Sequence, residues 1–366
     1  NFNQSLNNWN ISNVIQLNHV FYGASSFNQP LDNWNVSSVT TLKEMFNGAT
    51  SFNQSIASWD VSSVTNFQDY GLSSGHSDSK FTSSSQYYFT INVTPLTDSN
   101  IQAAVDSALN NGNLLDEYGG HISTWDVSQV TNMDGLFKDK TSFNEDISGW
   151  NVSNVTTLWQ TFEGATNFNQ DISGWDTSKV TNLSAAFYRA TNFNQPLDNW
   201  DVSSVTAMAW MFREAENFNQ DLNSWTTSSL INTRYMFQHA YKFNGVIGNW
   251  DTSKVTDMDH MFSAWTENVD KSGVFNQNIG GWDVSQVTNL NAIFANQFNF
   301  NQNLNSWNTS SVNNMNGVFL NCRNFNQPLD NWDFSSVNTT KKTFHSALVF
   351  NQDISGWDMS NVTDMQ

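Results

Sequence analysis

The sequence predicts an α/β repeat solenoid, a fold in which similar short units stack along one axis. A phrase that begins with Trp occurs thirteen times in the 366 residues, and Phe follows twelve residues later in eleven copies. Successive phrase Trp residues are 25 residues apart, except at two places where the spacing is 66 and 32. A fixed period of about 20 to 50 residues is typical of units that share one continuous core. The phrase Trp residues are Trp9, Trp34, Trp59, Trp125, Trp150, Trp175, Trp200, Trp225, Trp250, Trp282, Trp307, Trp332 and Trp357.

The residues after each phrase Trp predict a short helix. Val39, Leu42 and Met45 follow one another at steps of three, which is the spacing of a buried helical stripe. A Ser lies three residues after the Trp in all thirteen copies, so we expect its side chain to cap the first helical turn. Asp or Asn directly follows the Trp in twelve copies and offers a second acceptor. The predicted helix caps include Ser37, Ser153, Ser203 and Ser253.

The residues before each phrase Trp predict a short strand. They read Phe-Asn-Gln, a variable residue, Leu or Ile, two variable residues and Trp, so apolar and polar positions alternate. Parallel stacking of these segments would form one sheet and direct the Trp into the core. The recurring Asn is expected to bond the backbone of the next unit, giving a ladder along the stack. The predicted core Trp residues include Trp34, Trp150, Trp175, Trp200, Trp225, Trp250, Trp307 and Trp332.

The array breaks between Trp59 and Trp125. Residues 1–70 are expected to be the last repeats of a first array, and residues 71–89 a Ser-rich linker. Residues 90–366 are expected to form a second array of about ten repeats. Its N-terminal cap, residues 90–117, is predicted to hold a strand and a helix that is capped by Asp98 or Ser99 and buries Ile101.

The repeat resembles that of the BspA-type leucine-rich repeat surface proteins. The similarity is close at Phe193-Asn194-Gln195-Pro196-Leu197 followed by Trp200-Asp201-Val202-Ser203, and again from Phe325 to Trp332. It extends over the chain except for residues from about 68 to 117. The resemblance implies a leucine-rich-repeat-like right-handed coil with one short parallel strand and one short helix in each 25-residue repeat. It also implies an extracellular or cell-surface protein that adheres or binds proteins, without catalytic residues.

Composition narrows the function classes. The formal net charge is −19, which disfavours nucleic acid and anionic membranes as partners, and no run of 18 apolar residues could span a membrane. The single Cys322 occupies a slot that Ala fills in other repeats, so we expect a packing role. The His residues are scattered and nucleotide or hydrolase motifs are lacking, so neither an enzyme, a cofactor nor a metal site is expected.

The leading hypothesis is a non-catalytic extracellular scaffold or adhesin. It would contact other proteins or copies of itself as part of a longer, multi-array protein. A glycan-binding module is the alternative, because Trp159, Trp210 and Trp265 lie outside the Trp phrase. The Asp and Asn column after the phrase Trp could bind Ca²⁺, but capping explains its mixed composition better. Of eleven glycosylation sequons, Asn92 is the one least constrained by the repeat.

Overall fold

A computed structural model describes residues 2–54, 56, 59–66, 94–110, 114–115, 118, 120–264 and 271–365. The chain divides into two compact units, residues 1–95 with 111–121, and residues 96–110 with 122–366. The predicted linker, residues 71–89, and the predicted strand around Asn92 lie outside the described residues.

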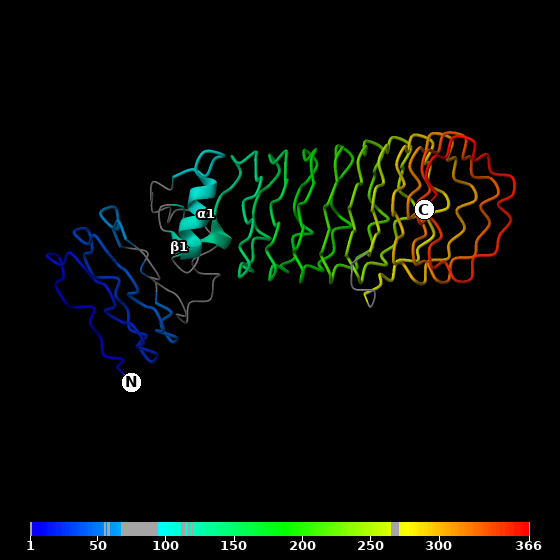
Figure 1. Ribbon diagram of the computed structural model, residues 1–366. Coiled ribbons are helices and arrows are strands. Elements are labelled where there is room, and N and C mark those ends of the chain that lie inside the picture. Colours follow the sequence, from blue (N-terminus) through cyan, green and yellow to red (C-terminus); the bar gives the residue numbers. More distant parts are fainter. Residues whose placement is uncertain are drawn as a thin grey trace. The chain divides into compact units, whose positions relative to one another are not determined.

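The described part of the chain contains four elements of regular secondary structure. They are helix α1 (Ile101–Asn110), strands β1 (Leu114–Leu115) and β2 (Gly120–His121), and the 3-10 turn η3 (Ile122–Thr124). β1 and β2 pair antiparallel, with Leu114 opposite His121. Beyond η3 the described chain runs as successive coils, which lie side by side in chain order from cyan to red (Figure 1).

Helix α1 begins the second unit and buries the stripe that its sequence predicts. Ile101, Ala104 and Val105 are at most 2 % exposed. Asp98, however, is not the cap of this helix. Its carboxylate accepts hydrogen bonds from the backbone amides of Thr131 and Asn132, at 2.7 and 3.0 Å, and from the Thr131 hydroxyl. In later coils the amide equivalent to that of Thr131 bonds a carbonyl of the preceding coil, so Asp98 completes the ladder where it starts.

The parallel ladder between coils is formed by the sixth to eighth residues after each phrase Trp. The Thr181 amide donates to the Thr156 carbonyl, and the Leu183 amide donates to the Ala207 carbonyl of the following coil. Single parallel bridges link the residues between them, such as Asn182 with Ala207, from coil to coil. The ladder therefore does not lie in the Phe-Asn-Gln segment, where the sequence predicted a strand.

The Phe-Asn-Gln segment is joined to its neighbour through side chains instead. The Asn169 side-chain oxygen accepts the Asn194 amide at 2.9 Å, and the Asn194 oxygen accepts the Asn219 amide at 2.8 Å. Gln220 Nε2 donates to the Asn194 carbonyl at 2.9 Å. These bonds confirm the predicted Asn ladder, although its side chains are partly exposed and not buried. Because the Asn oxygens take most of the inter-coil bonds, the described coils form no continuous backbone ladder here, although the Leu222 amide donates to the Val246 carbonyl.

The short helix predicted after each phrase Trp is replaced by consecutive turns in the described coils. Between Ala185 and Ala190 the amides alternate in their partners. Those of Ala185, Phe187 and Arg189 donate to the next coil, and those of Ala186, Tyr188 and Ala190 donate three residues back. The φ angles of Ala185 and Arg189 are 54° and 60°, so the backbone leaves the right-handed region twice. Half of the amides thus serve stacking, which a continuous helix would not permit.

The predicted Ser caps are consequently not helix caps. The backbone amides of Ser37, Ser153, Ser203 and Ser253 each donate to the Asn or Asp two residues earlier, at 2.9 to 3.2 Å. The acceptor is the residue that directly follows the phrase Trp, namely Asn35, Asn151, Asp201 or Asp251. Asn and Asp favour such a local turn because their side chains reach the backbone two residues on.

Columns of stacked aromatic rings run through the core of each unit. The ring centroids of Trp175 and Trp200 lie 6.4 Å apart and nearly parallel, and Trp200 Nε1 donates to the Ile172 carbonyl at 3.0 Å. Two Phe columns run beside the Trp column, with Phe187 and Phe193 at 4.1 Å. All eight predicted core Trp residues are at most 4 % exposed: Trp34, Trp150, Trp175, Trp200, Trp225, Trp250, Trp307 and Trp332. In pairs such as Trp175 and Trp200, stacking places one indole over the next while its N–H remains bonded.

Candidate binding face on the second unit

The run of turns after each phrase Trp directs side chains outward at four positions of the repeat. Each position, or register, is counted from the phrase Trp. The eighth, eleventh and twelfth residues after the Trp are buried in most coils, whereas the ninth, tenth, thirteenth and fourteenth lie at the surface or partly so. In most coils these registers carry small or polar residues. In the coils that begin at Trp175, Trp200, Trp225 and Trp250 they carry a concentration of aromatic and charged residues. The aromatic–arginine face comprises Tyr188, Arg189, Trp210, Arg213, Glu214, Arg234, Tyr235, Asp259 and His260.

Four rings on this face touch one another across successive coils. Trp210 meets Tyr188 edge to face at 5.9 Å between centroids and meets Tyr235 in the same way at 5.8 Å. Tyr235 stacks on His260 at 4.9 Å. Trp210 is 39 % exposed, whereas Tyr188 is buried. The rings therefore form a partly exposed apolar strip that crosses the coils.

Guanidinium groups lie over the rings. The central carbon of Arg213 is 5.2 Å from the Tyr188 centroid, 5.1 Å from that of Trp210 and 5.6 Å from that of Tyr235. Arg189 and Arg234 each lie 4.8 Å from the ring of the neighbouring Tyr. Each contact is within the range of favourable cation–π attraction. Three of the chain's four Arg residues are thus gathered on one face of an acidic protein.

Carboxylates pair with all three arginines, and Arg213 Nε lies 3.4 Å from Glu214 Oε1. Arg189 Nε donates to Glu214 Oε2 at 3.1 Å, and this bond raises the pKa of the Arg189 guanidinium above its usual value. Arg234 Nε donates to Asp259 Oδ2 at 2.9 Å. Burial lowers the pKa of Arg234, but its hydrogen bonds to Tyr235 and Asp259 outweigh that effect and raise the pKa overall. Both groups are therefore charged and oriented.

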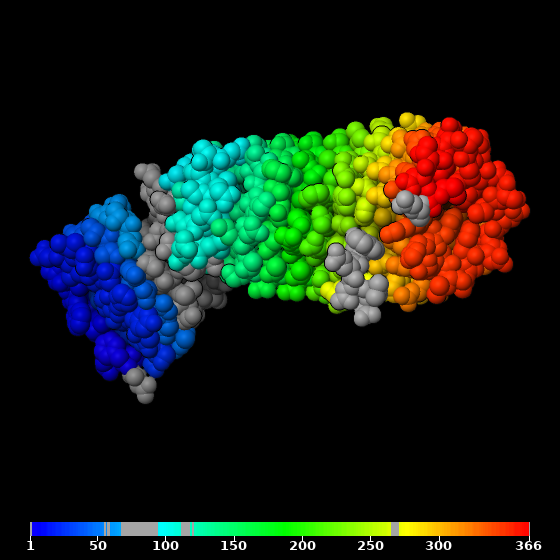
Figure 2. Space-filling view, in the orientation of Figure 1, coloured from blue at the N-terminus to red at the C-terminus, as the bar shows by residue number. Residues whose placement is uncertain are grey.

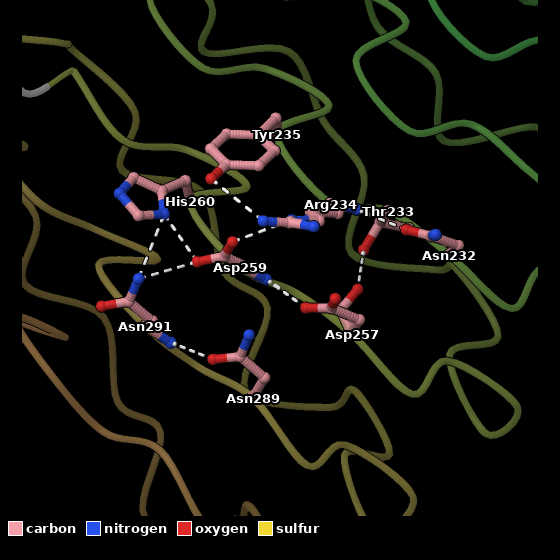
Figure 3. A network of polar contacts seen from close by, with 9 residues as sticks. All are labelled: Asn232, Thr233, Arg234, Tyr235, Asp257, Asp259, His260, Asn289 and Asn291. Carbon is pink, nitrogen blue, oxygen red and sulfur yellow. Dashed lines mark hydrogen bonds and ion pairs between the residues drawn. The ribbon is translucent and has the colours of Figure 1, made fainter. Parts of the chain in front are cut away.

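Asp259 is the buried centre of a polar network (Figure 3). Its carboxylate contacts His260 Nδ1 at 2.6 Å and accepts a bond from Asn291 Nδ2 at 2.9 Å, in addition to Arg234. Burial raises the pKa of Asp259, but the bonds to His260, Asn291 and Arg234 outweigh it and hold the pKa below its usual value. Below this network, Asn232, Asp257 and Asn289 cap the amides two residues on. The charged side chains thus rest on a repeated, well-bonded backbone.

Buried polar atoms without a hydrogen-bond partner gather next to this face. In the described part of the chain they are Glu163 Oε2, Arg213 Nε, Gln238 Oε1 and Asn296 Nδ2. All four belong to the thirteenth or fourteenth residue after a phrase Trp. Such atoms cost stability. Of the four residues, Arg213 belongs to the aromatic–arginine face.

The structure places the residues that the sequence singled out as functional in different surroundings. Trp210 lies on the aromatic–arginine face, and Trp159, two coils earlier, is 43 % exposed. Trp265 and Asn92 lie outside the described residues. Cys322 is buried, with its thiol directed at the Phe294 carbonyl, and burial raises the pKa of that thiol strongly.

The Asp column engages neighbouring Ser residues. Hydrogen bonds from the Ser hydroxyl and amide lower the pKa of carboxylates such as Asp176 and Asp251. Over the described ranges, no three His, Cys, Asp or Glu side chains gather in a way that could hold a metal ion.

Sequence reasoning missed most of the face. The registers of Tyr188, Arg213, Tyr235 and Asp259 vary from coil to coil, and aromatic or charged residues occupy them in four successive coils. That clustering of unusual residues is a signal that could have identified the face before the structure was known.

Comparison with family models identifies the repeat. The family described as "Mycoplasma protein of unknown function, DUF285" matches residues 1–97, 103–205, 171–272 and 266–366. The comparisons with curated proteins and with solved structures gave no match. Within the residues that could be searched, no helix is long and apolar enough to cross a membrane.

Proposed function

The chain belongs to the DUF285 family of repeat proteins, and from that premise we propose that it is a non-catalytic scaffold that binds other proteins. The observation that carries the proposal is the aromatic–arginine face. Trp, Tyr and Arg are the residues that contribute most to binding energy at protein interfaces. Here they are held by ring contacts and ion pairs on a rigid stack of coils, so little side-chain entropy would be lost on binding.

A glycan-binding surface is the second candidate, favoured by the exposure of Trp159 and Trp210. Sugars stack on the open face of an aromatic ring. The Arg213 guanidinium, however, lies over the rings of Tyr188, Trp210 and Tyr235, and this competes with a sugar for those faces. Protein binding is therefore the better supported of the two at this face.

The type of repeat and the cellular location of the chain are also proposals. We place the repeats with the BspA-type leucine-rich repeat proteins, and the chain at the cell surface or outside the cell. The support is the repeat phrase itself, including Phe193 to Ser203. Protease treatment of intact source cells tests the location. Loss of this chain's antibody signal while a cytosolic marker survives is expected, and protection equal to that of the marker would contradict it.

Binding arrays test the function. The full chain is applied to an array of secreted and cell-surface proteins and, in parallel, to a glycan array. We expect specific protein signals that fall at least tenfold in the Trp210→Ala variant and remain in Trp159→Ala. Glycan signals with a blank protein array, or protein signals indifferent to Trp210, would contradict protein binding at this face.

A further inference from the structure

We propose that the aromatic–arginine face binds an acidic segment of a partner protein, whose carboxylates pair with Arg189 and Arg234. The inference rests on the proposed protein-binding function and adds the chemistry of the partner. It depends on three features of the face, namely its charge relative to the rest of the chain, the way its arginines are held, and their spacing.

Charge makes this face distinct from the rest of the molecule. The chain has 33 acidic residues against 14 basic ones, so most of its surface repels a negatively charged partner. On the face, the three arginines outnumber the carboxylates Glu214 and Asp259, which are largely covered, and the nearby Glu163, which also acts on Arg189, is paired with Lys138. An acidic segment is thus attracted here and repelled elsewhere. That contrast fixes where the partner binds as well as how strongly.

The arginines are held so that part of each guanidinium stays available. Arg189 and Arg234 each use Nε for the bond to a carboxylate of this chain. Their side chains remain 56 % and 46 % exposed while lying over tyrosine rings. A guanidinium has five N–H donors in a fixed plane, so the remaining donors can engage a second carboxylate. Because the first carboxylate and the ring already fix the group, binding requires little further ordering.

The spacing of the arginines suits an extended segment. Arg189 belongs to the coil that begins at Trp175 and Arg234 to the one that begins at Trp225, two coils further on. Coils joined by parallel bridges are about 4.8 Å apart, so the two coils are offset by about 10 Å. Arg189 and Arg234 also differ by five positions in register, so this offset is the least separation between them, and residues three or more apart in an extended chain span it at about 3.3 Å each. The exposed Trp210 ring between them offers an apolar contact.

A pair of labelled peptides tests this chemistry. The probe is a fluorescent peptide of four Glu-Ala-Tyr units, and its control has Gln in place of each Glu. Fluorescence anisotropy with the full chain measures binding at low and physiological salt. We expect the Glu peptide to bind at least tenfold more tightly than the Gln peptide and to weaken as salt rises. We also expect Arg189→Gln to lose at least tenfold in affinity, and Arg234→Gln likewise.

Matched variants keep the result interpretable. Arg323→Gln removes the one arginine outside the face, which lies 3.9 Å from the Phe298 ring, and is expected to leave binding unchanged. Arg234 contacts the buried Asp259, so the thermal midpoint of Arg234→Gln is checked. Arg189 pairs with Glu214 nearer the surface. If Arg234→Gln does not fold, the affinity of Arg189→Gln alone tests the proposal.

The inference is overturned if the two peptides bind equally, if neither binds, or if Arg323→Gln weakens binding as much as Arg189→Gln. It is also overturned if heparin binds this face and the Glu peptide does not, because the ligand would then be a sulfated glycan. Array proteins that depend on Trp210 but not on Arg189 would refute the acidic partner while leaving the proposed protein binding intact.

Discussion

Two tryptophans of one coil show how register decides the role of a residue. Trp200 is 3 % exposed, stacks on the Trp175 indole of the preceding coil and donates its N–H to the Ile172 carbonyl. Trp210, ten residues later, has a left-handed φ of 64° and is 39 % exposed. The 25-residue period was sufficient to predict the first role. The second depends on turn geometry that the period does not reveal.

Truncation of these two side chains should have very different effects on stability. Trp200→Ala is expected to lower the free energy of unfolding by about 3–5 kcal/mol, because it opens a cavity between coils and removes a buried hydrogen bond. Trp210→Ala should cost about 1 kcal/mol or less, since much of its ring is already in water. Urea unfolding followed by circular dichroism measures both. Similar losses in the two variants would show that the phrase Trp is not the core residue.

The local turns in which a Ser amide donates to the Asp two residues earlier predict a specific dependence of stability on pH. Hydrogen bonds from the Ser253 hydroxyl and amide lower the pKa of Asp251. A carboxyl whose pKa is lower in the folded state stabilises it above the unfolded pKa of about 3.9, and this contribution disappears as pH falls through the folded value. Asp251→Asn keeps the turn, as Asn35 and Asn151 do, but cannot titrate.

The expected difference between these two proteins is therefore confined to one pH range. Wild-type protein should be slightly more stable than Asp251→Asn at pH 6, and the difference should vanish toward pH 2. Thermal midpoints across this range measure it. A difference that grows as pH falls would contradict the assigned hydrogen bonds.

At the scale of the element, the turns explain why the helix prediction failed. Apolar residues at steps of three and four suit a short helix, and they equally suit consecutive turns that bury one residue in each. Turns form in place of a helix because amides such as those of Ala185 and Phe187 donate to carbonyls of the next coil. That partner is 24 residues away in sequence and is invisible to local propensity. The cap helix α1 was predictable because its bonds are local.

The left-handed positions of the turns provide a test of this account. Gly164 has a φ of 69°, and a Cβ there would lie 3.3 Å from the Asp139 Cα of the preceding coil. Gly164→Ala should therefore cost about 1–2 kcal/mol from backbone strain, plus the cost of the close contact. Gly149→Ala, where a Cβ would meet nothing within 4 Å, is the control and should change stability by less than about 0.5 kcal/mol. Equal stability of the two variants would argue for a helical backbone at Gly164.

At the scale of the whole molecule, each unit is built by repetition. In the second unit the coils follow one another in chain order, and each coloured band of the surface comes from a short stretch of sequence (Figure 2). Stability in such a stack is a sum of coil and interface contributions, so individual coils can carry unusual side chains without loss of the fold. The repeat and the core columns were predictable from the period. The aromatic–arginine face was not, because it depends on which departures from the repeat become neighbours.

The spacing of the coils is the most direct test of the central claim that each 25-residue repeat adds one coil. Spin labels are placed at Lys179 and Ser336, which share one register six coils apart, in a Cys322→Ala background. At about 4.8 Å for each coil, pulsed electron paramagnetic resonance should give a narrow distance distribution near 29 Å. Deletion of residues 201–225 should shorten this by about 5 Å. An unchanged distance after the deletion, or a broad distribution in the parent chain, would contradict the stacked-coil structure.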